Sequence, residues 1–233
     1  MGKSIKNLII TPIGDDFVHF EWFKGAPNFD TVLLYYGDNQ TIFELNKKHT
    51  PYVYQSKGVK YHLIKNYIES NIDFVKKYEY IWLPDNDVSI CTEEINKLFE
   101  INNRFELHLS QPSMNGYISH DITKPIHNSF LRYTNFVEVL APLFSIDCLF
   151  KIYETFDLNF SSWGYDFLWP SILGYPKNKI AIIDDIIMTH TKPIGQDYSR
   201  FPICPSIELS ELLSSYNLTE EKINYSMVVK NFT

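Results

Sequence analysis

The sequence of 233 residues is poor in cysteine, in glycine and in positive charge. Its three cysteines, Cys91, Cys148 and Cys204, are widely scattered and odd in number. This argues against a disulfide frame or a zinc site and fits reduced thiols in a cytoplasmic protein. With only 9 glycines, 45% hydrophobic and 16% aromatic residues, the composition excludes a disordered or low-complexity chain.

The net charge is −7, and the sequence contains no basic stripe. A nucleic-acid-binding protein needs such a stripe to neutralise phosphates, so that class is excluded. No apolar run is long enough to span a bilayer, and no charged-then-apolar signal segment opens the sequence. We therefore expect a cytoplasmic protein without a transmembrane segment, either free or peripherally associated with the inner face of the membrane.

The most informative stretch is an apolar run, residues 78–83, that ends at Pro84 and two carboxylates, Asp85 and Asp87. In extended backbone, residues i and i+2 point to the same side, so both carboxylates can face one hard cation. Pro84 cannot donate a ladder hydrogen bond, so sheet pairing should stop there. The alternative is a solvated turn, in which Asp and Asn are also common.

Around this stretch, apolar runs alternate with helical patterns, which favours an α/β fold with a parallel sheet. Strands are expected at 6–14, 29–38, 52–55, 78–84, 105–109 and 179–190. Helices are expected after Gly14, at 57–68, after Thr92 and after Ser145, which suits an N-cap. Residues 113–135 lose the pattern and predict a long polar loop of the kind that is often functional.

Several polar residues stand where they could bind a ligand. Lys57 and Lys60 lie near a predicted helix start, against the dipole preference, so an anion such as a diphosphate could offset them; an ordinary solvated face is the alternative. Asp38 follows a strand and could accept hydrogen bonds from a ribose or base, although a Gly-Asp turn needs no ligand. His190 ends the last apolar run, where a lone histidine is usually structural.

Two further acids lie in apolar surroundings. Glu138 sits inside an apolar segment and would need a partner if buried. Asp166 follows Trp163 and Gly164 among large rings, which can raise a carboxylate toward a general-base pKa; an Asp that caps a helix gives the same pattern. His120, in the polar loop, could be a ligand or a plain surface residue.

Together these segments resemble the glycosyltransferase-like domains of unknown function of plants and bacteria, which belong with the GT-A nucleotide-sugar transferases. The resemblance covers residues 6–193 and is carried by motifs that occur in order. They are Thr11-Pro12-Ile13-Gly14, Leu34-Tyr35-Tyr36-Gly37-Asp38, Lys57-Gly58-Val59-Lys60-Tyr61, Tyr80-Ile81-Trp82-Leu83-Pro84-Asp85-Asn86-Asp87, Ser110-Gln111-Pro112, Val137-Glu138-Val139-Leu140-Ala141-Pro142-Leu143-Phe144-Ser145, Trp163-Gly164-Tyr165-Asp166 and Ile182-Ile183-Asp184-Asp185 leading to His190.

The resemblance implies an α/β, GT-A-like (Rossmann-like) single domain with a mostly parallel central sheet flanked by helices. This domain is expected over residues 1–200, with the nucleotide-sugar half at about 1–110 and the acceptor half at about 111–200. Residues 201–233 contain an amphipathic segment and are expected to form a helical extension.

It also implies roles for particular residues. Asp85, Asp87 and His190 would hold Mn²⁺ or Mg²⁺, and Asp166 would be the catalytic base of an inverting enzyme. The expected nucleotide-sugar residues are Thr11, Pro12, Gly14, Asp38, Lys57, Lys60 and Asn86, and the expected acceptor-side residues are His120, Glu138, Trp163 and Gly164. The sequence departs from the family at Asn86, where an acid is common, and in showing no membrane anchor of the kind that plant members carry.

The implied activity is metal-dependent transfer of a sugar from a nucleotide-sugar donor to a saccharide or lipid-linked saccharide, in surface polysaccharide or glycan synthesis. Two alternatives stay open: a non-catalytic nucleotide-sugar-binding module, and a nucleotidyl- or phosphotransferase that uses the same carboxylates. The sequence has neither a Walker-type nor a kinase-like glycine-rich loop, which disfavours the last.

Overall fold

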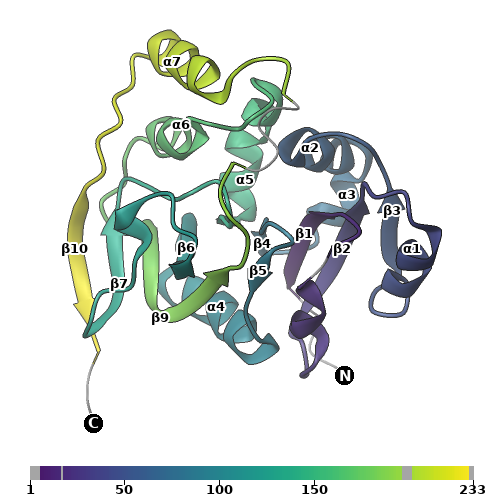
Figure 1. Ribbon diagram of the computed structural model, residues 1–233. Coiled ribbons are helices and arrows are strands. Elements are labelled where there is room, and N and C mark those ends of the chain that lie inside the picture. Colours follow the sequence, from purple (N-terminus) through teal and green to yellow (C-terminus); the bar gives the residue numbers. More distant parts are fainter. Residues whose placement is uncertain (1–5, 17, 196–200, 231–233) are drawn as a thin grey trace.

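One mixed sheet organises the part of the chain that the computed structural model describes, which is residues 6–16, 18–195 and 201–230. Its strands are β1 (Asn7–Ile13), β2 (Phe29–Tyr35), β3 (Tyr52–Gln55), β4 (Tyr80–Trp82), β5 (Val88–Ser89), β6 (Leu109–Gly116), β7 (Ser129–Thr134), β8 (Leu143–Ser145), β9 (Ile180–His190) and β10 (Asn224–Val229). Within the described residues the strand order is β10-β7-β9-β6-β8-β4-β1-β2-β3, and β5 pairs with the end of β9 (Figure 1).

Except for β8, the strands that carry the predicted motifs pair in parallel with a neighbour. β1 lies between β2 and β4, β3 pairs with β2, and β6 pairs with β9, all in parallel. Antiparallel strands complete the sheet: β8 joins β4 to β6, and β7 and β10 extend it beyond β9. Because parallel strands share a direction, the carboxyl ends of β1, β2, β3 and β4 lie at one edge, where α/β folds bind ligands.

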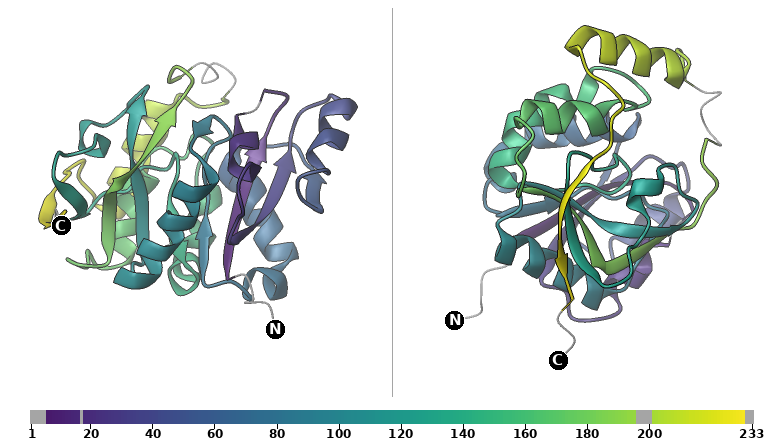
Figure 2. Two further views of the ribbon diagram at one scale, coloured as in Figure 1. Left: turned by 90° about the horizontal axis from the view of Figure 1, so that it is seen from below. Right: turned by 90° about the vertical axis from the view of Figure 1, so that its left-hand side faces the viewer.

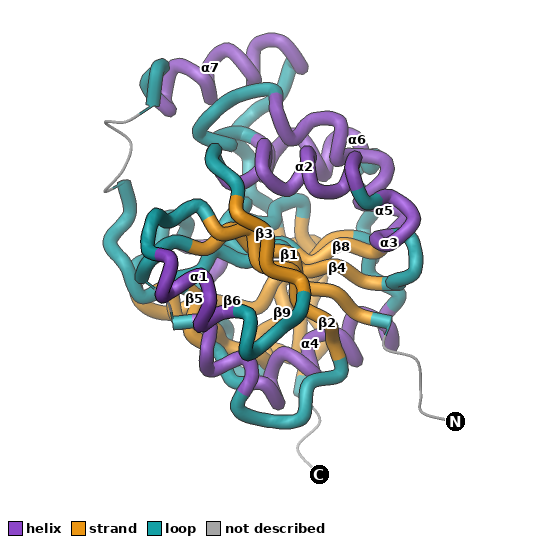
Figure 3. The backbone as a smooth tube through the Cα atoms, turned by 90° about the vertical axis from the view of Figure 1, so that its right-hand side faces the viewer, coloured by secondary structure: helices purple, strands orange, loops and turns teal. Residues whose placement is uncertain are grey.

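Helices cover both faces of the sheet. The α-helices are α1 (Gln40–Asn46), α2 (Lys60–Ser70), α3 (Ile72–Val75), α4 (Thr92–Phe105), α5 (Ile146–Ile152), α6 (Tyr165–Ile172) and α7 (Pro205–Tyr216), and the 3₁₀ helices are η1 (His19–Phe23), η2 (Asp121–Thr123) and η3 (Tyr153–Asp157). Figure 3 shows α2, α5 and α6 above the sheet and α4 below it. The α/β prediction, with helices flanking a mostly parallel sheet, is thus confirmed, and antiparallel strands are added to the parallel core.

The alternation of strand side chains builds a core on each face. On β1, Leu8 and Ile10 pack into the cluster beneath α2, α5 and α6, whereas Ile9 packs into the cluster that includes Leu98 and Phe99 of α4. This follows from the period of two in a strand, which explains why β1 reads as a continuous apolar run. No helix among the described residues is long and apolar enough to cross a membrane.

Two predicted elements inside the domain were wrong. The polar stretch at 113–135 was expected to be a loop, but it contains the end of β6 and all of β7. β7 was missed because Ser129, Arg132 and Thr134 are buried polar residues, which hide the apolar alternation. The strand expected at 105–109 begins late, since α4 continues through Phe105 and ends at Glu106 in a left-handed conformation (φ 49°).

The two ends of the domain also differ from expectation. The helix expected after Gly14 is only the short 3₁₀ helix η1. The segment after residue 200 was expected to be helical, and α7 is, but Asn224–Val229 forms β10 instead. Figure 2 shows the chain descending from α7 along one edge of the sheet, where β10 pairs with β7. Pairing with the edge strand β7, and not helical spacing, decides the structure there.

A buried ion pair joins β7 to β9. Arg132 Nε donates to Asp184 Oδ2 at 2.8 Å, and Nη2 donates to Oδ1 at 3.1 Å. Arg132 also donates to the carbonyls of Ile122 (2.8 Å) and Lys124 (2.9 Å), while Asp184 Oδ1 accepts from the Ile126 amide at 3.1 Å. The pair therefore fixes the loop that follows β6 against the sheet.

We predict that Arg132→Met lowers the free energy of unfolding by about 3–5 kcal/mol, because Asp184, whose side chain is fully buried, would lose its compensating charge. Urea denaturation would measure it. Replacing both residues, Arg132→Met with Asp184→Leu, should cost less than the single change. Lys24→Ala, which removes an exposed ion pair with Glu21, is the control and should leave the midpoint in place. A fully stable single variant would contradict the prediction.

Candidate functional site

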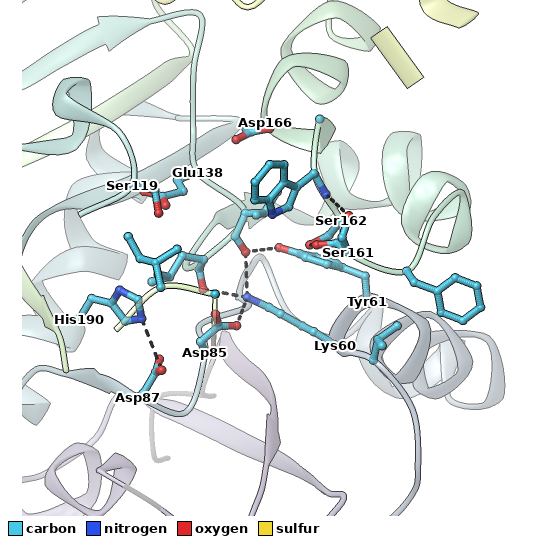
Figure 4. A pocket seen from close by; sticks show the side chains of 18 of the residues that line it. Lys60, Tyr61, Asp85, Asp87, Ser119, Glu138, Ser161, Ser162, Asp166 and His190 are labelled. Atoms are coloured by element: carbon cyan, nitrogen blue, oxygen red, sulfur yellow. Dashed lines mark hydrogen bonds and ion pairs between the residues drawn. The ribbon is translucent and has the colours of Figure 1, made fainter. Parts of the chain in front are cut away.

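A cavity of about 880 Å³ opens at the carboxyl ends of the parallel strands, between them and the amino ends of α2 and α6. This volume is within the range of small-molecule sites, about 300–1,000 Å³. Figure 4 shows Asp85, Asp87 and His190 in one part of it and Glu138 and Asp166 in another. The cavity thus collects acids from segments far apart in the sequence.

The Asp85–Asp87 segment is held rigidly where β4 ends. The Leu83 amide donates to the Pro142 carbonyl at 2.9 Å, and the Asp85 amide donates to the Leu140 carbonyl at 2.9 Å. The buried Thr11 hydroxyl donates to the Pro84 carbonyl at 2.8 Å. The two carboxylates are therefore presented by backbone that is fixed from both sides, as the sequence pattern predicted for a strand end.

His190 closes β9 and faces Asp87. Its Nε2 lies 3.4 Å from Asp87 Oδ2, and its Nδ1 lies 2.7 Å from the Tyr117 carbonyl. Since a carbonyl only accepts, Nδ1 carries the hydrogen and Nε2 is turned to the carboxylate. Burial lowers the pKa of His190, but the hydrogen bonds to Asp87 and Tyr117 and the charges of Asp87 and Asp85 outweigh it, so the net shift is upward.

Asp85 is engaged by Lys60, at the first residue of α2. The ammonium lies 2.7 Å from Asp85 Oδ1 and donates to the Val139 and Leu140 carbonyls at 2.8 and 2.7 Å. Three acceptors use the three donors of an ammonium. Burial raises the pKa of Asp85 and lowers that of Lys60, and the ion pair opposes both shifts. Lys60 would have to give up one acceptor to bind a phosphate.

Asp85 and Asp87 bring carboxylate oxygens to the cavity, and such oxygens are the donors that a hard divalent cation shared with a phosphate ligand takes. Asp87 Oδ1 is buried and has no hydrogen-bond partner among the described residues. Among the described residues, no three or more His, Cys, Asp or Glu side chains are grouped so that they could hold a metal ion, so Asp85, Asp87 and His190 do not form such a group in this structure. Magnesium characteristically uses one or two carboxylates together with substrate phosphates, so an incomplete protein set suits it. The Nδ1–carbonyl contact of His190 is also the usual support of a ligating imidazole.

Asp166 lies on the first turn of α6, next to His120. His120 Nε2 is 3.5 Å from Asp166 Oδ2, whereas Oδ1 is buried without a hydrogen-bond partner among the described residues. Gly164, the N-cap residue of α6, has a φ of 95°, which suits glycine, and a Cβ there would lie 2.7 Å from Leu212 of α7. The close packing of α7 on α6 therefore requires this glycine, which supports the placement of Asp166.

Glu138 is the second acid in this part of the cavity. It is 4% exposed, its backbone amide donates to Gln111 Oε1, and its Oε2 has no hydrogen-bond partner among the described residues. Burial raises the pKa of Glu138 to about 7, helped by the charge of Asp166 and opposed by His120, a Ser119 hydrogen bond and His190. A carboxyl with such a pKa can give or take a proton near neutral pH.

Most of the residues predicted from the sequence line this one cavity. They are Pro12, Lys60, Asp85, Asn86, Asp87, His120, Glu138, Trp163, Gly164, Asp166 and His190. Four predicted residues are not among the lining residues: Thr11, Gly14, Asp38 and Lys57. The Thr11 hydroxyl instead donates to the Pro84 carbonyl, and the Lys57 ammonium pairs with the exposed Asp38 carboxylate at 2.8 Å. Their nucleotide-sugar roles stay predictions.

Sequence reasoning missed Ser119 and Tyr61. Ser119 lies close enough to Glu138 to lower the pKa of its carboxyl, and the Tyr61 hydroxyl donates to the Val139 carbonyl at 2.6 Å. Tyr61 lies within one of the quoted motifs, which could have drawn attention to it. Ser119 has no signal beyond its position beside His120 in a polar stretch.

The pKa of Glu138 predicts how stability depends on pH. The ordinary pKa is 4.5 and the folded value about 7, so the folded protein holds an extra proton between these values. Stability from this group is fully present below pH 4.5 and is lost as pH rises through 7. We expect the unfolding free energy of the natural protein, relative to Glu138→Gln, to fall across this window and then level off. Urea denaturation from pH 4 to 9 would measure it; a constant difference would contradict it.

One family model matches part of the sequence. The family model described as "Protein of unknown function (DUF707)" matches residues 21–132. None of the curated proteins has a matching sequence.

Solved structures of S. aureus TarS share the fold. TarS 1–349 in complex with UDP-GlcNAc has a TM-score of 0.57 and 15% identity, over 93% of this chain and 68% of that one. A longer TarS structure gives 0.54 and 14%, over 91% of this chain and 43% of that one. TarS 1–349 in complex with UDP gives 0.53 and 13%, over 91% and 71%. The chain thus has a GT-A-like fold and, over residues 21–132, matches DUF707, in agreement with its resemblance to a glycosyltransferase-like family of unknown function.

Proposed function

We propose that this chain is a glycosyltransferase that moves a sugar from a nucleotide-sugar donor to a hydroxyl of a saccharide or lipid-linked saccharide. The observation that carries the proposal is the convergence of two acidic groups on one cavity, Asp85 and Asp87 with His190 at the strand ends and Asp166 with Glu138 opposite. Sugar transfer needs both a site for a diphosphate leaving group and a proton acceptor for the incoming hydroxyl.

The donor would bind beside Asp85 and Asp87. In this proposal, these carboxylates and His190 Nε2 hold Mn²⁺ or Mg²⁺, whose chemical contribution is to neutralise charge on the leaving diphosphate. Asn86, whose amide donates to the Asp16 carbonyl at 2.9 Å, keeps the segment between the two acids in place. The binding of UDP-GlcNAc and UDP by TarS, which has the same fold, makes uridine nucleotides the first donors to test.

Asp166 would accept the proton of the acceptor hydroxyl. Its Oδ2 is held near His120, so the free Oδ1 is the atom that takes the proton as the acceptor oxygen bonds to the anomeric carbon and the bond to the diphosphate breaks. The transition state would resemble an oxocarbenium ion. One base opposite the leaving group corresponds to direct displacement, so we propose inversion at the anomeric carbon.

One prediction of the proposed function concerns donor binding. We expect UDP or a UDP-sugar with Mn²⁺ to raise the unfolding midpoint by about 5–10 °C at one hundred times its dissociation constant. Asp87→Asn should abolish the metal-dependent part of this rise, because the neutral amide lacks the charge and the second oxygen of a carboxylate. Thermal unfolding against a panel of nucleoside diphosphates and their sugars would measure both effects.

The matched control is Asp73→Asn, an exposed residue on α3 outside the cavity, which should behave as the natural protein does. A full metal-dependent rise in both Asp85→Asn and Asp87→Asn would remove these residues from the metal role.

Another prediction concerns Asp166 as the proposed catalytic base. Asp166→Asn should keep the donor-induced rise in midpoint but lower the rate of transfer by about 10²–10⁴-fold, the usual contribution of general base catalysis. Release of nucleoside diphosphate would measure the rate, and release of pyrophosphate instead would indicate a nucleotidyltransferase. Asp157→Asn, which affects an exposed pair with Lys65, is the control. Full activity in Asp166→Asn would exclude this residue as the base.

A further inference from the structure

We propose that Glu208, on α7, is a positioning residue of the cavity. Its carboxylate holds the loop of residues 159–164 in the shape in which that loop forms a wall for the acceptor. The role toward an acceptor rests on the proposed function, whereas the hold on the loop does not depend on it. Glu208 does not line the cavity, so it acts through the loop and not by touching a ligand.

Glu208 is a buried carboxylate with both oxygens in use, and it is 4% exposed. Its Oε1 accepts from the Phe160 amide at 2.9 Å, and its Oε2 accepts from the Ser161 amide at 2.8 Å. Hydrogen bonds to an ionised carboxylate are about twice as strong as those between neutral groups. Acidic side chains are almost never buried without partners, and here the partners are backbone amides of the loop. The burial of Glu208 and the shape of the loop therefore depend on each other.

The side chains of the loop satisfy only part of its own backbone. Asn159 Oδ1 accepts from the Ser162 amide at 2.8 Å, and Ser161 Oγ accepts from the Trp163 amide at 3.3 Å. The two amides before these are the ones that Glu208 accepts from. Ser162 also has a φ of 61°, which is uncommon for a residue other than glycine and has to be stabilised by the surroundings. α7 thus supplies hydrogen bonds that the loop does not make by itself.

α7 also contacts the other end of the loop. A Cβ on Gly164 would lie 2.7 Å from Leu212 and 3.2 Å from Leu209, so the helix packs directly on this glycine. Glu208 and Leu212 are four residues apart and therefore lie on one face of α7. The same face of one helix holds the loop at both ends, and Gly164 is the N-cap of α6, which carries Asp166.

The loop that Glu208 holds is part of the cavity wall. Ser161, Ser162 and Trp163 line the cavity, and Figure 4 shows the two serines on the side away from His190. A loop that adopts several shapes is competent to bind for only a fraction of the time, and the apparent affinity falls by that fraction. Glu208 should therefore govern binding of the acceptor and leave the donor region unaffected.

Glu208→Gln tests the hold on the loop, because the amide keeps the shape of the side chain but has one acceptor oxygen instead of two. NMR spectra of the full chain would be recorded without nucleotide or acceptor. We expect the Phe160 and Ser161 amides to exchange with solvent at least tenfold faster, since the loop opens more easily. The indole resonance of Trp163 should shift, whereas that of Trp82, in the core on the α4 face of the sheet, should stay in place.

Transfer kinetics supply a readout that a purely structural role would not change. With UDP-GlcNAc, Mn²⁺ and a panel of methyl hexosides, Glu208→Gln should raise the KM for the hexoside about tenfold, because fewer molecules hold the competent loop. The rise in unfolding midpoint that UDP and Mn²⁺ cause should equal that of the natural protein.

The matched control is Glu211→Gln, the same change at an exposed residue of α7, and it should leave every readout as in the natural protein. If Glu208→Gln does not fold, Glu208→Asp, which withdraws the carboxylate by one methylene group, gives the same comparison. The inference is overturned if the two amides and the Trp163 indole are unchanged, or if they change and the hexoside KM does not. Failure of the proposed function is seen separately, as the absence of any effect of nucleotide on the natural protein, and the NMR readouts then decide the role of Glu208.

Discussion

Four carboxylates, from Asp85, Asp87, Glu138 and Asp166, face one cavity, and the electrostatic free energy of keeping them together is the constraint on which the rest of the site depends. Buried charges are tolerated only where partners compensate them. The fold supplies those partners from distant segments: the Lys60 ammonium from α2, the His190 imidazole from β9, and Ser119 and His120 from the loop after β6. The compensation is incomplete, because one oxygen each of Asp87, Glu138 and Asp166 is buried without a hydrogen-bond partner among the described residues.

The same constraint explains why a structural ion pair lies behind the site. Arg132 and Asp184 do not line the cavity, yet they hydrogen-bond the carbonyls of Ile122 and Lys124 and the amide of Ile126, in the loop that presents His120. This loop carries Ser119 and His120, which are partners of Glu138 and Asp166. It has to be fixed, because an acid that lost its partner would be left uncompensated in a low-dielectric environment. The Arg132–Asp184 pair therefore contributes both to the stability of the sheet edge, where it joins β7 to β9, and to the geometry of the cavity, because it fixes the loop that carries His120.

Much of this could be predicted from the sequence, and the misses have physical causes. The alternation of apolar runs and helical patterns predicted the α/β class. The position of Asp85 and Asp87 after an apolar strand predicted that they lie at a ligand-binding edge of the sheet, and both line the cavity. β7 was missed because its buried polar residues, Arg132 above all, are paired only through the tertiary structure. The hydrogen bonds of the Lys60 ammonium could not be predicted either, since their acceptors, the Val139 and Leu140 carbonyls, are about eighty positions away in the sequence. Ser119 could not be found, because a hydroxyl in a polar loop has no distinguishing pattern.

The pairing of β10 with β7 has a consequence for how the chain reaches this state. Arg132 on β7 and Asn224 on β10 are 92 positions apart, so during synthesis β7 is complete long before the strand that covers its outer edge has emerged. In that interval the nascent sheet ends in free amide and carbonyl groups, which can pair with another unfinished chain as readily as with the correct segment. Closing so distant a contact is also slow, since the loop entropy is lost before the hydrogen bonds form. The yield of folded protein should thus be limited by crowding of nascent chains and not by the stability of the finished domain.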